Sequence, residues 1–459
     1  MEIQFLGAAK EVTGSMHVVR VGDFDVVLDA GKFSGPPEKT RKKNSKFLIN
    51  PSEIERVVLS HSHLDHSGRL PMMMRYGFKG KIFTTHATAD VIDVILRDAA
   101  EIEAESAERL SEMSKNKEKV EPLFTYKDVR AIYSHLKTYD YYKEFNLSDT
   151  ISVTFYDAGH ILGSAITKLT IQEGRTTKTI LYTGDLGRPN MPFVRNPDIV
   201  KDVDYLITET TYGDSLHEPI ERTKEKIKEL VIWIYRHSGK LIVPSFALGR
   251  TQDVVYILNE LVEQGQIPVV PTYIDSPLAL DIVDLYKSHS ECYDKETWDL
   301  INSGDNPLEF KELHFVRDES ESRDLDYQRG PAIIISSSGM CTGGRILRHL
   351  YHFADDRNTV ILFTGYQAEG TLGRKLLDGA KTINLYGKKI RVRARIERVD
   401  GLSAHADQQE LLNYIKQLGK IKKVFLVHGE IHPLETFSRL LKKHNYSTHI
   451  PSMGELWKE

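Results

Sequence analysis

Four side chains that can bind a metal ion lie within six positions of the segment Ser60–Gly68. The segment follows a short apolar run that predicts a β-strand. Along an extended chain, residues two apart point the same way, so His61 and His63 can face one ion. The turn that follows re-aims Asp65 and His66, and two adjacent ions follow from this spacing. Imidazole and carboxylate ligands without thiolate favour zinc, while manganese and iron stay open on ligand type alone.

Three further candidate ligands stand at the ends of predicted strands. His160 and Asp185 each follow a β-type run and a glycine, in the sequences Asp-Ala-Gly-His and Tyr-Thr-Gly-Asp. Near the C-terminus, His428 follows an apolar run. With the first four residues this makes seven candidate ligands. Two cations about 3.5 to 4 Å apart can lower the pKa of a water between them and offset charge that builds on a phosphate.

The predicted elements that must position these residues follow two different patterns along the chain. Strands separated by glycine or charged residues dominate the first part. We expect strands at Ile3–Leu6, His17–Val21, Phe24–Leu28, Arg56–Leu59, Lys81–Thr84, Ile151–Tyr156, Ala165–Ile171 and Thr179–Thr183. Among them, helical spacing of apolar residues predicts a long amphipathic helix over 86–114. An exposed turn over 114–121 and a second helix near 126–137 are expected to follow it.

After Thr208 the pattern changes to alternating helices and strands, which is typical of an α/β domain with a parallel sheet. Helices are expected at 220–237, 251–264 and 279–288 and near 343, and strands at 240–243, 269–274, 332–335 and 359–363. The strand-rich pattern of the first part then returns. We expect strands there at 383–385, 389–397 and 423–427 and a helix at 407–417. We therefore predict that the second domain is inserted into the first, with divisions at 1–208, 209–385 and 386–459.

The composition limits the classes of partner. The chain of 459 residues carries 61 basic and 65 acidic side chains, a formal charge of −4, so a nucleic-acid site must concentrate its positive charge locally. Two cysteines are too few for a disulfide framework or a thiolate zinc site, which favours a reducing cytoplasm. No secretion signal is visible, and no apolar run reaches the roughly 18 residues that a bilayer requires. The sequence predicts a soluble, cytoplasmic protein without a membrane partner.

The seven candidate ligands resemble the pattern of the metallo-β-lactamase superfamily, which has an HxHxDH run, a later histidine, a bridging aspartate and a last histidine. The resemblance implies an α/β fold built as an αββα sandwich, with two Zn2+ per chain. It assigns one zinc to His61, His63, His160 and Asp185 and the other to Asp65, His66, Asp185 and His428. Asp29 matches the aspartate that holds the ligand loop from behind, with an ordinary turn aspartate as the alternative.

Two more residues narrow the resemblance to the β-CASP nuclease branch, in which an α/β domain with a parallel sheet flanked by helices is inserted. Glu209, His405 and His428 resemble its motifs A, B and C, and the resemblance covers nearly the whole chain. It implies that His405 contacts the scissile phosphate and protonates the leaving oxygen, while Glu209 holds the other ring nitrogen. These two and Asp65 form the expected catalytic set, although Glu209 could be an ordinary strand-end acid. A histidine at motif C accompanies RNA-processing members, so His428 favours RNA over DNA.

Three segments rich in glycine and serine resemble the β-CASP segments that line the RNA channel. Each follows a predicted strand and opens a helix, so hydroxyls, amides and helix starts can face an anion. One such segment alone would be a weak signal, because serine and glycine also build ordinary turns. The residues expected to bind RNA phosphates are Ser336, Ser337, Ser338, Gly339, Thr371, Gly373, Arg374 and Arg250.

These features together predict a zinc-dependent ribonuclease that hydrolyses single-stranded RNA, as an endonuclease, a 5′–3′ exonuclease or both. The upstream product would keep a 3′ hydroxyl and the downstream product a 5′ phosphate. The resemblance extends to prokaryotic and archaeal β-CASP ribonucleases and to the endonuclease of pre-mRNA 3′-end cleavage. No KH-type segment precedes the first strand and the chain ends soon after motif C, which leaves the subgroup, a homodimer and an RNA-processing complex open. The alternatives are a DNA nuclease of the same branch, an inactive RNA-binding scaffold and a small-molecule hydrolase.

Overall fold

The computed structural model describes residues 1–35, 37–113, 119–368 and 370–459. These residues form two compact units. Unit 1 comprises Met1–Leu216 and His405–Glu459, and unit 2 comprises His217–Ala404, so the chain leaves unit 1 and later returns to it. Most of the turn that we expected over 114–121 lies outside the described residues.

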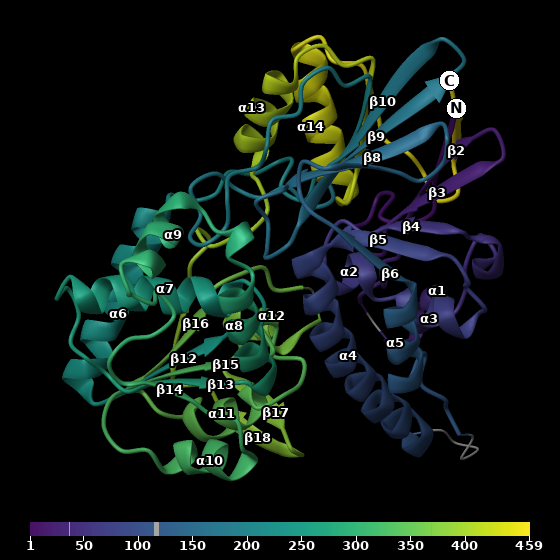
Figure 1. Ribbon diagram of the computed structural model, residues 1–459. Helices are drawn as coiled ribbons and strands as arrows, with labels where there is room; N and C mark the ends of the chain where they lie inside the picture. Colours follow the sequence, from purple (N-terminus) through teal and green to yellow (C-terminus); the bar gives the residue numbers. More distant parts are fainter. Residues whose placement is uncertain (36, 114–118, 369) are drawn as a thin grey trace. The chain divides into compact units, whose positions relative to one another are not determined.

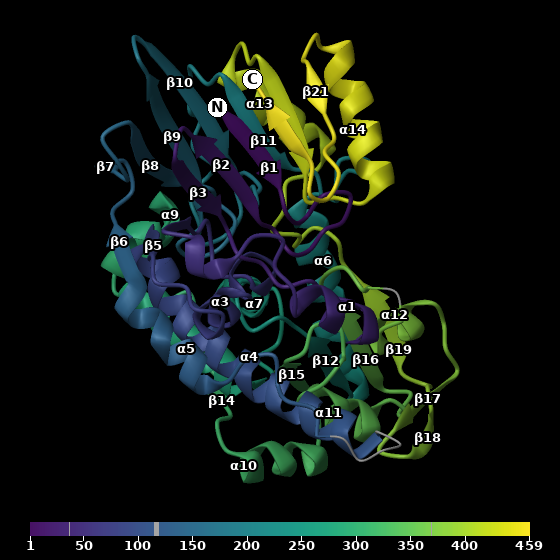
Figure 2. The same cartoon turned by 90° about the vertical axis from the view of Figure 1, so that its right-hand side faces the viewer.

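The first of two seven-stranded sheets in unit 1 has the strand order β22-β1-β2-β3-β4-β5-β6. Its strands are β1 (Glu2–Phe5), β2 (His17–Val21), β3 (Phe24–Leu28), β4 (Arg56–Val58), β5 (Lys81–Thr85), β6 (Leu136–Tyr139) and β22 (Leu456–Lys458). β1 pairs antiparallel with β22, so the two ends of the chain lie side by side (Figures 1 and 2). β1 to β5 lie where the pattern of apolar residues predicts strands, and that prediction is confirmed.

The second sheet has the order β21-β20-β11-β10-β9-β8-β7. Its strands are β7 (Glu144–Asn146), β8 (Ile151–Asp157), β9 (Ala165–Glu173), β10 (Thr176–Tyr182), β11 (Tyr205–Glu209), β20 (Lys423–Val427) and β21 (Thr448–His449). β7 to β10 form an antiparallel meander. β10, β11 and β20 are parallel neighbours, so their carboxyl ends meet at one edge of the sheet.

Helices cover the outer faces of both sheets, and the large aromatic residues fill the space between the sheets. Phe5, Phe155 and Phe425 come from different strands and are fully buried in the inner cluster. Ile92 packs from α4 (His86–Met113) onto the first sheet, and Leu411 packs from α13 (Gln408–Leu418) onto the second. Figure 1 shows α13 and α14 (Ile431–Lys443) beside the second sheet. Unit 1 is therefore an αββα sandwich, and the predicted fold class is confirmed.

The remaining helices of unit 1 are short except for α14, and one of them ends earlier than expected. They are α1 (Pro37–Asn44), η1 (Pro51–Glu53), α2 (Leu64–Ser67), α3 (Leu70–Arg75), α5 (Tyr126–Ile132), η2 (Tyr133–His135) and α14 (Ile431–Lys443). The prediction that the second helix continues to Lys137 is wrong at the C-terminal end of the helix. Residues Leu136–Tyr139 instead form β6, because they pair in parallel with β5 and complete the first sheet.

Unit 2 is built on a six-stranded sheet with the order β14-β13-β15-β12-β16-β19, in which every pairing is parallel. Its strands are β12 (Lys240–Pro244), β13 (Thr272–Asp275), β14 (Leu313–Phe315), β15 (Ala332–Ser336), β16 (Thr359–Phe363) and β19 (Arg395–Arg398). Figure 1 shows helices on both faces of this sheet. The predicted parallel α/β domain is therefore confirmed. Its β13 begins later than expected, because Pro271 has no N–H to donate.

The helices of unit 2 alternate with these strands. They are α6 (Ile220–His237), α7 (Arg250–Glu263), α8 (Pro277–Ser288), η3 (Ser290–Cys292), α9 (Lys295–Asn302), α10 (Glu319–Asp324), η4 (Leu325–Tyr327), α11 (Ile346–Phe353) and α12 (Leu372–Leu377). Throughout the described ranges of both units, no helix combines the length and the apolar character needed to cross a membrane.

The end of unit 2 differs from expectation. The single strand expected over 389–397 is two strands, β18 (Lys388–Arg391) and β19, and β18 forms a hairpin with β17 (Thr382–Leu385). These strands belong to unit 2 rather than to the first domain, because β19 pairs with the open edge of β16. We therefore propose His217–Ala404 as the inserted domain in place of 209–385.

Candidate metal centre

The candidate ligands of unit 1 lie just beyond the carboxyl ends of strands. His61 follows β4, His160 follows β8, Asp185 follows β10 and His428 comes directly after β20. Since β10 and β20 both run parallel to β11, Asp185 and His428 emerge at the same edge of the second sheet. Side chains that are far apart in the sequence are thus brought to one place by strand pairing.

A single helical turn re-aims the other ligands. His63 is the residue before α2, which contains Asp65 and His66. The backbone carbonyl of Asp65 accepts a 2.8 Å hydrogen bond from Ser15 N, which ties the turn to the loop after β1. A side chain at Gly31 would place its Cβ 1.6 Å from the same carbonyl oxygen, so only glycine allows this approach.

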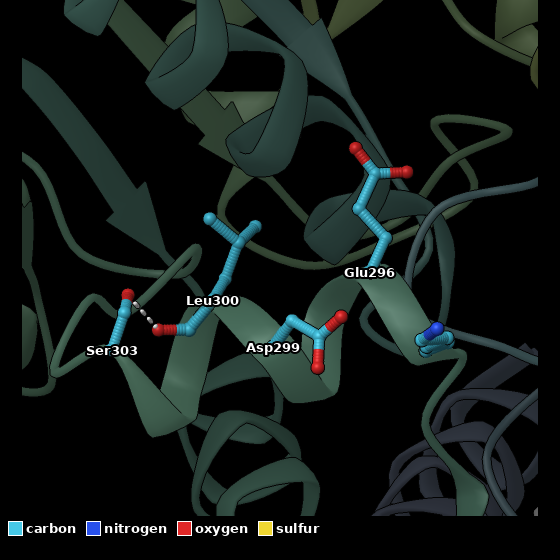
Figure 3. A pocket seen from close by; sticks show the side chains of 5 residues that line it. Glu296, Asp299, Leu300 and Ser303 are labelled. Atoms are coloured by element: carbon cyan, nitrogen blue, oxygen red, sulfur yellow. Dashed lines mark hydrogen bonds between the residues drawn. The ribbon is translucent and has the colours of Figure 1, made fainter.

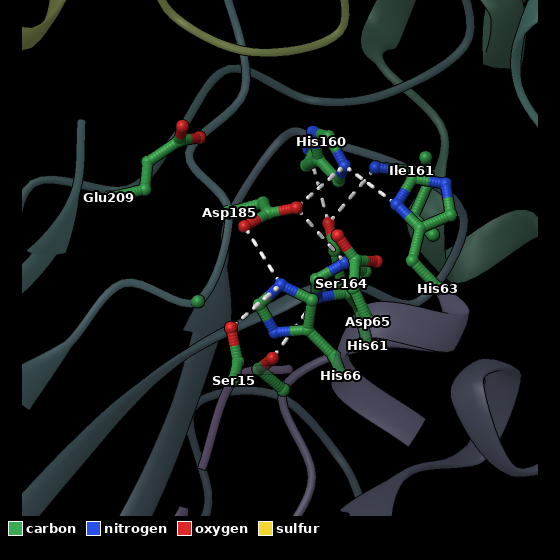
Figure 4. A network of polar contacts seen from close by, with 12 residues as sticks. Ser15, His61, His63, Asp65, His66, His160, Ile161, Ser164, Asp185 and Glu209 are labelled. Atoms are coloured by element: carbon green, nitrogen blue, oxygen red, sulfur yellow. Dashed lines mark hydrogen bonds and ion pairs between the residues drawn. The ribbon is translucent and has the colours of Figure 1, made fainter. Parts of the chain in front are cut away.

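The possible ligand atoms among the described residues fall into three groups, within each of which all atoms lie within 4.8 Å of one another. The first group is His61, His63, His160 and Asp185, the second is Asp65, His66 and His428, and the third, which overlaps both, is Asp185, Glu209 and His428. Figure 4 shows the Asp185 carboxylate pointing toward His66 on one side and His160 on the other. The first group contains the residues that the resemblance implies for one zinc, and the second lacks Asp185 from the set that it implies for the other.

Asp185 presents one carboxylate oxygen to each of the first two groups. Its Oδ2 atom lies 3.3 Å from His61 Nε2 and 3.5 Å from His160 Nε2. Its Oδ1 atom lies 3.0 Å from His66 Nε2 and 3.6 Å from His428 Nε2. A carboxylate in this position can bridge two cations, with one oxygen on each.

Several buried polar atoms of the cluster have no hydrogen-bond partner within the described part of the chain. They are His61 Nε2 and both carboxylate oxygens of Asp185, and these side chains are at most 1% exposed. Each such atom costs roughly 1 to 3 kcal/mol, and more if it is charged. Cations among these nitrogens and oxygens would remove that cost. A donor set of imidazoles and carboxylates without sulfur fits zinc.

Burial and neighbouring charges set the protonation of this cluster. Burial lowers the pKa of His61 and His160 and brings the pKa of His63 to about 3, so these rings are neutral near pH 7. Burial alone would raise the pKa of Asp185, but the surrounding imidazoles hold it well below its ordinary range. These three imidazoles and the ionised Asp185 are in the forms that bind a cation. Burial alone would lower the pKa of His66, but the carboxylates of Asp185 and Asp29 raise it well above its ordinary value, so a cation there would have to displace a proton.

Asp29, which the resemblance places behind the ligand loop, contacts His66 and Ser60. Its Oδ2 atom lies 2.6 Å from His66 Nδ1 and accepts a 2.7 Å hydrogen bond from Ser60 Oγ and a 2.6 Å hydrogen bond from the Tyr182 hydroxyl. Its Oδ1 atom accepts from Ser60 N at 2.7 Å. Sequence reasoning missed Ser60 and Tyr182. A signal was available for Tyr182, because a tyrosine on a buried strand needs a partner for its hydroxyl.

His405 and Glu209 form a second polar pair at the centre. His405 Nδ1 lies 3.0 Å from Glu209 Oε1 and 3.1 Å from Oε2, and Leu186 N donates to Oε1 at 2.7 Å. Burial alone would lower the pKa of His405, but the carboxylates of Glu209 and Asp185 raise it to about 9. His405 is therefore protonated at neutral pH and can donate a proton from the nitrogen that does not face Glu209.

The three predicted phosphate segments of unit 2 are brought together at the carboxyl edge of its sheet. They follow β12, β15 and β16, which are adjacent in the sheet. Ser245 N donates to Ser336 O at 3.0 Å, and Gly373 N donates to Met340 O at 3.2 Å. Gln367 Nε2 donates to Gly339 O at 3.0 Å and joins two of the segments.

The side chains of these segments differ in what they can offer a ligand. Ser336 and Gly373 are buried, and the Ser336 hydroxyl already donates to Asp275 O at 2.9 Å. Gly339 is buried as well, and Arg250 is 11% exposed beside Asp253. The more accessible residues are Ser337, Ser338, Thr371 and Arg374, the last of which pairs with Asp378 at 2.9 Å.

A shallow recess on α9 of unit 2 contains none of the predicted site residues. It is lined by Lys295, Glu296, Asp299, Leu300 and Ser303 (Figure 3). Two carboxylates against one ammonium group disfavour a phosphate there. The recess therefore does not extend the predicted phosphate segments.

Three family profiles match the chain in succession. They describe a metallo-β-lactamase superfamily domain at residues 18–189, a β-CASP domain at 251–376 and a Zn-dependent metallo-hydrolase RNA specificity domain at 389–451. The first match contains Asp185 and all five candidate ligands that precede it in the sequence. The third match contains His405 and His428.

Curated relatives are similar along the whole chain. Ribonuclease TTHA0252 of Thermus thermophilus is 33% identical over 99% of each chain. An RNase J-like protein of Methanocaldococcus jannaschii is 32% identical over 99% of each chain. The transcription termination factor FttA of the same organism is 32% identical over 97% of this chain and 70% of its own length.

A solved structure, that of a protein of unknown function from Enterococcus faecalis, covers 99% of both chains with a TM-score of 0.55. At 13% sequence identity this likeness concerns the fold alone. The profiles, the full-length relatives and the clustered ligands agree with one another. The chain belongs to the β-CASP branch of the metallo-β-lactamase superfamily of metal-dependent hydrolases.

Proposed function

We propose that this protein is a ribonuclease that hydrolyses phosphodiester bonds of single-stranded RNA at a centre of two zinc ions. The observation that carries the proposal is the position of Asp185, whose two oxygens face two separate ligand groups. His61, His63 and His160 complete one group, and Asp65, His66 and His428 complete the other. When bound, two such cations activate a water molecule and offset the charge that develops on a phosphate.

The protein's own residues orient these ligands. Asp29 engages His66 Nδ1 at 2.6 Å and thereby turns His66 Nε2 toward Asp185. Partners of this kind commonly change metal affinity by about 10- to 100-fold. Asp65 belongs to the catalytic set as a ligand, with its Oδ2 atom 3.4 Å from His428 Nε2.

His405 is the proposed general acid. Glu209 lies against its Nδ1 atom, so we assign proton donation to the leaving oxygen of the substrate to Nε2, on the other side of the ring. Its ring centroid lies 4.7 Å from that of His160 and 6.0 Å from that of His428, so His405 stands beside both ligand groups. A pKa of about 9 keeps the proton available at neutral pH, as proton donation requires.

RNA is the proposed substrate for reasons that lie in both units. The match to an RNA specificity domain covers residues 389–451, most of which belong to the C-terminal part of unit 1, and the full-length relatives include a named ribonuclease. In unit 2, Ser337, Ser338 and Thr371 lie on neighbouring loops and offer hydroxyls. Arg374, in the first turn of α12, adds a positive charge beside Asp378. Such groups bind the sugar-phosphate backbone without reading its sequence.

The test is to incubate the zinc-loaded protein with RNA and DNA of one sequence, each supplied as an end-labelled linear strand and as a closed circle. RNA should be cut to products with 5′ phosphate and 3′ hydroxyl ends, while DNA is spared. The Asp185→Asn variant is the matched control, since it keeps the side-chain size and removes the bridging charge. It should leave RNA intact.

The same assay separates the alternatives. Cutting of circular RNA identifies an endonuclease, and mononucleotides from linear RNA with intact circles identify an exonuclease. Equal cutting of DNA would replace the proposal by a DNA nuclease. RNA binding without any cleavage would replace it by an inactive scaffold.

A further inference from the structure

The hydroxyl of Thr211 lies between the partner of the proposed acid and a proposed ligand. Its Oγ1 atom is 2.5 Å from Glu209 Oε2 and 3.0 Å from His428 Nδ1. The backbone carbonyl of His428 is a third neighbour at 3.2 Å. Glu209 ends β11 opposite Val427 of β20, so the residues that follow the two strands are neighbours. Thr211 therefore links the ends of two parallel strands.

The direction of these hydrogen bonds follows from counting protons. A hydroxyl has one proton, and an ionised carboxylate has none to give, so the 2.5 Å contact uses the proton of Thr211. Two oxygens at that separation without a proton between them would repel each other. The Thr211 oxygen then has only lone pairs for His428. The 3.0 Å contact is a hydrogen bond only if His428 Nδ1 carries a hydrogen.

We infer that Thr211 is a positioning residue, which fixes His428 as the Nδ1–H tautomer and turns its Nε2 lone pair toward the metal centre. That nitrogen lies 3.4 Å from Asp65 Oδ2 and 3.6 Å from Asp185 Oδ1, among the atoms of the second ligand group. In a neutral imidazole the nitrogen without a hydrogen is the one that binds a metal. The inference rests on the proposed function, since that proposal makes His428 a ligand.

Glu209 does not depend on Thr211 for its own position. Leu186 N donates to Glu209 Oε1 at 2.7 Å, and His405 Nδ1 lies against both carboxylate oxygens. Loss of the Thr211 hydroxyl should therefore act on metal binding through His428 and leave the contact between Glu209 and His405 in place.

Three variants test this role. Thr211→Val removes the hydroxyl and keeps the shape of the side chain, whereas Thr211→Ser keeps the hydroxyl and removes the methyl group. The matched control is Thr210→Val, because Thr210 is fully buried and its hydroxyl has no hydrogen-bond partner among the residues that the structure describes. The readouts are thermal unfolding, zinc affinity by competition with a chelator, and the His428 tautomer by 1H–15N correlation spectra of protein labelled at histidine.

Wild-type His428 should show a hydrogen on Nδ1. Thr211→Val should weaken binding of the second zinc ion by about 10- to 100-fold, the usual effect of losing a partner behind a ligand. Thr211→Ser and Thr210→Val should bind zinc as the wild type does. Cleavage of RNA by Thr211→Val should recover in excess zinc.

Other results would overturn the inference. A hydrogen on Nε2 of His428 in the wild-type protein would contradict the inferred tautomer, even if the Thr211→Val variant did not fold. Unchanged zinc affinity in a folded Thr211→Val variant would show that the Thr211 hydroxyl does not position His428 for metal binding. A loss of zinc affinity in Thr211→Ser as large as that in Thr211→Val would also contradict the inference, because Thr211→Ser keeps the hydroxyl. A wild-type protein that leaves RNA intact would count against the proposed function, while the tautomer and the affinities still test Thr211.

Discussion

His405 Nδ1 lies 3.0 Å from Glu209 Oε1 and 3.1 Å from Glu209 Oε2. The contact commits one nitrogen of the ring to a fully buried carboxylate, while the imidazole side chain keeps 22% of its surface exposed. His405 is also absent from the groups of atoms that could hold a metal ion within the described residues. The geometry thus separates a histidine that can act on a substrate from the histidines that can hold cations.

The first prediction concerns that separation. His405→Ala should keep its zinc content and slow RNA cleavage by about 100-fold or more, the scale expected for loss of a general acid. Zinc can be counted by mass spectrometry of the native protein and cleavage followed with end-labelled RNA. Loss of zinc in this variant would reassign His405 as a ligand.

The second prediction concerns the bridge. Asp185→Ala should deplete both cations, because each oxygen of Asp185 faces one ligand group. Asp65→Ala is the comparison, since Asp65 belongs to the second group alone, and it should deplete one cation. Zinc stoichiometry after dialysis measures both variants. An unchanged stoichiometry in Asp185→Ala would refute the bridging role.

The third prediction concerns the hydroxyl of Tyr182. Tyr182→Phe removes one donor to Asp29, which in turn holds His66, so zinc affinity should fall by about 10-fold. Tyr205→Phe is a matched control, because Tyr205 is also buried on a neighbouring strand but donates to Glu459 instead. Affinity is measured by chelator competition. Equal affinities in the two variants would mean that Tyr182 serves packing only.

Much of this centre could be predicted from the sequence because its ligands stand at recognisable positions. His61 and His63 follow one apolar run, and Asp185 and His428 each come shortly after another apolar run. The contacts of Thr211 could not be read in this way. It meets His428 across 217 residues of sequence, and the meeting depends on the register between β11 and β20.

The two errors in the predicted helices and strands have a common physical reason. Local spacing of apolar residues favoured a helix up to Lys137 and a single strand over 389–397. In the structure, β6 completes the first sheet beside β5, and β19 completes the sheet of unit 2 beside β16. Pairing with a distant strand edge overrode the local pattern in both places.

The fourth prediction concerns removal of the cations. Chelation should leave His61 Nε2 and the Asp185 oxygens buried without a hydrogen-bond partner among the described residues, so the free energy of unfolding should fall. Zinc at 100 times its dissociation constant should add about 2.7 kcal/mol of stability. Chemical unfolding with and without a chelator measures the difference. Identical midpoints would contradict cation binding at this cluster.

The fifth prediction concerns a buried ion pair in unit 2. His349 Nε2 lies 2.6 Å from Asp275 Oδ2, and both side chains are fully buried. Burial would lower the pKa of His349, but its hydrogen bond with Asp275 and the Asp326 carboxylate 3.6 Å from Nδ1 raise the pKa above its ordinary value of 6.5. Burial would raise the pKa of Asp275, but hydrogen bonds from His349 and Ser322 lower it below 3.8.

The raised pKa of His349 gives stability that is fully present below about pH 6.5 and is lost as the pH rises through the folded-state pKa. The lowered pKa of Asp275 gives stability above about pH 3.8 that is lost on acidification. His349→Gln should therefore cost about 3 kcal/mol near pH 5.5 and less at alkaline pH. The exposed His237→Gln is the control. A cost that does not change with pH would contradict a charged His349.

The most direct measurement is a titration of zinc into the metal-free protein, with bound zinc and cleavage of single-stranded RNA followed in the same samples. Two zinc ions should bind per chain, and cleavage should appear only as the second ion binds, because Asp185 faces both ligand groups. Full cleavage with one bound ion, or intact RNA with two, would contradict a two-zinc ribonuclease.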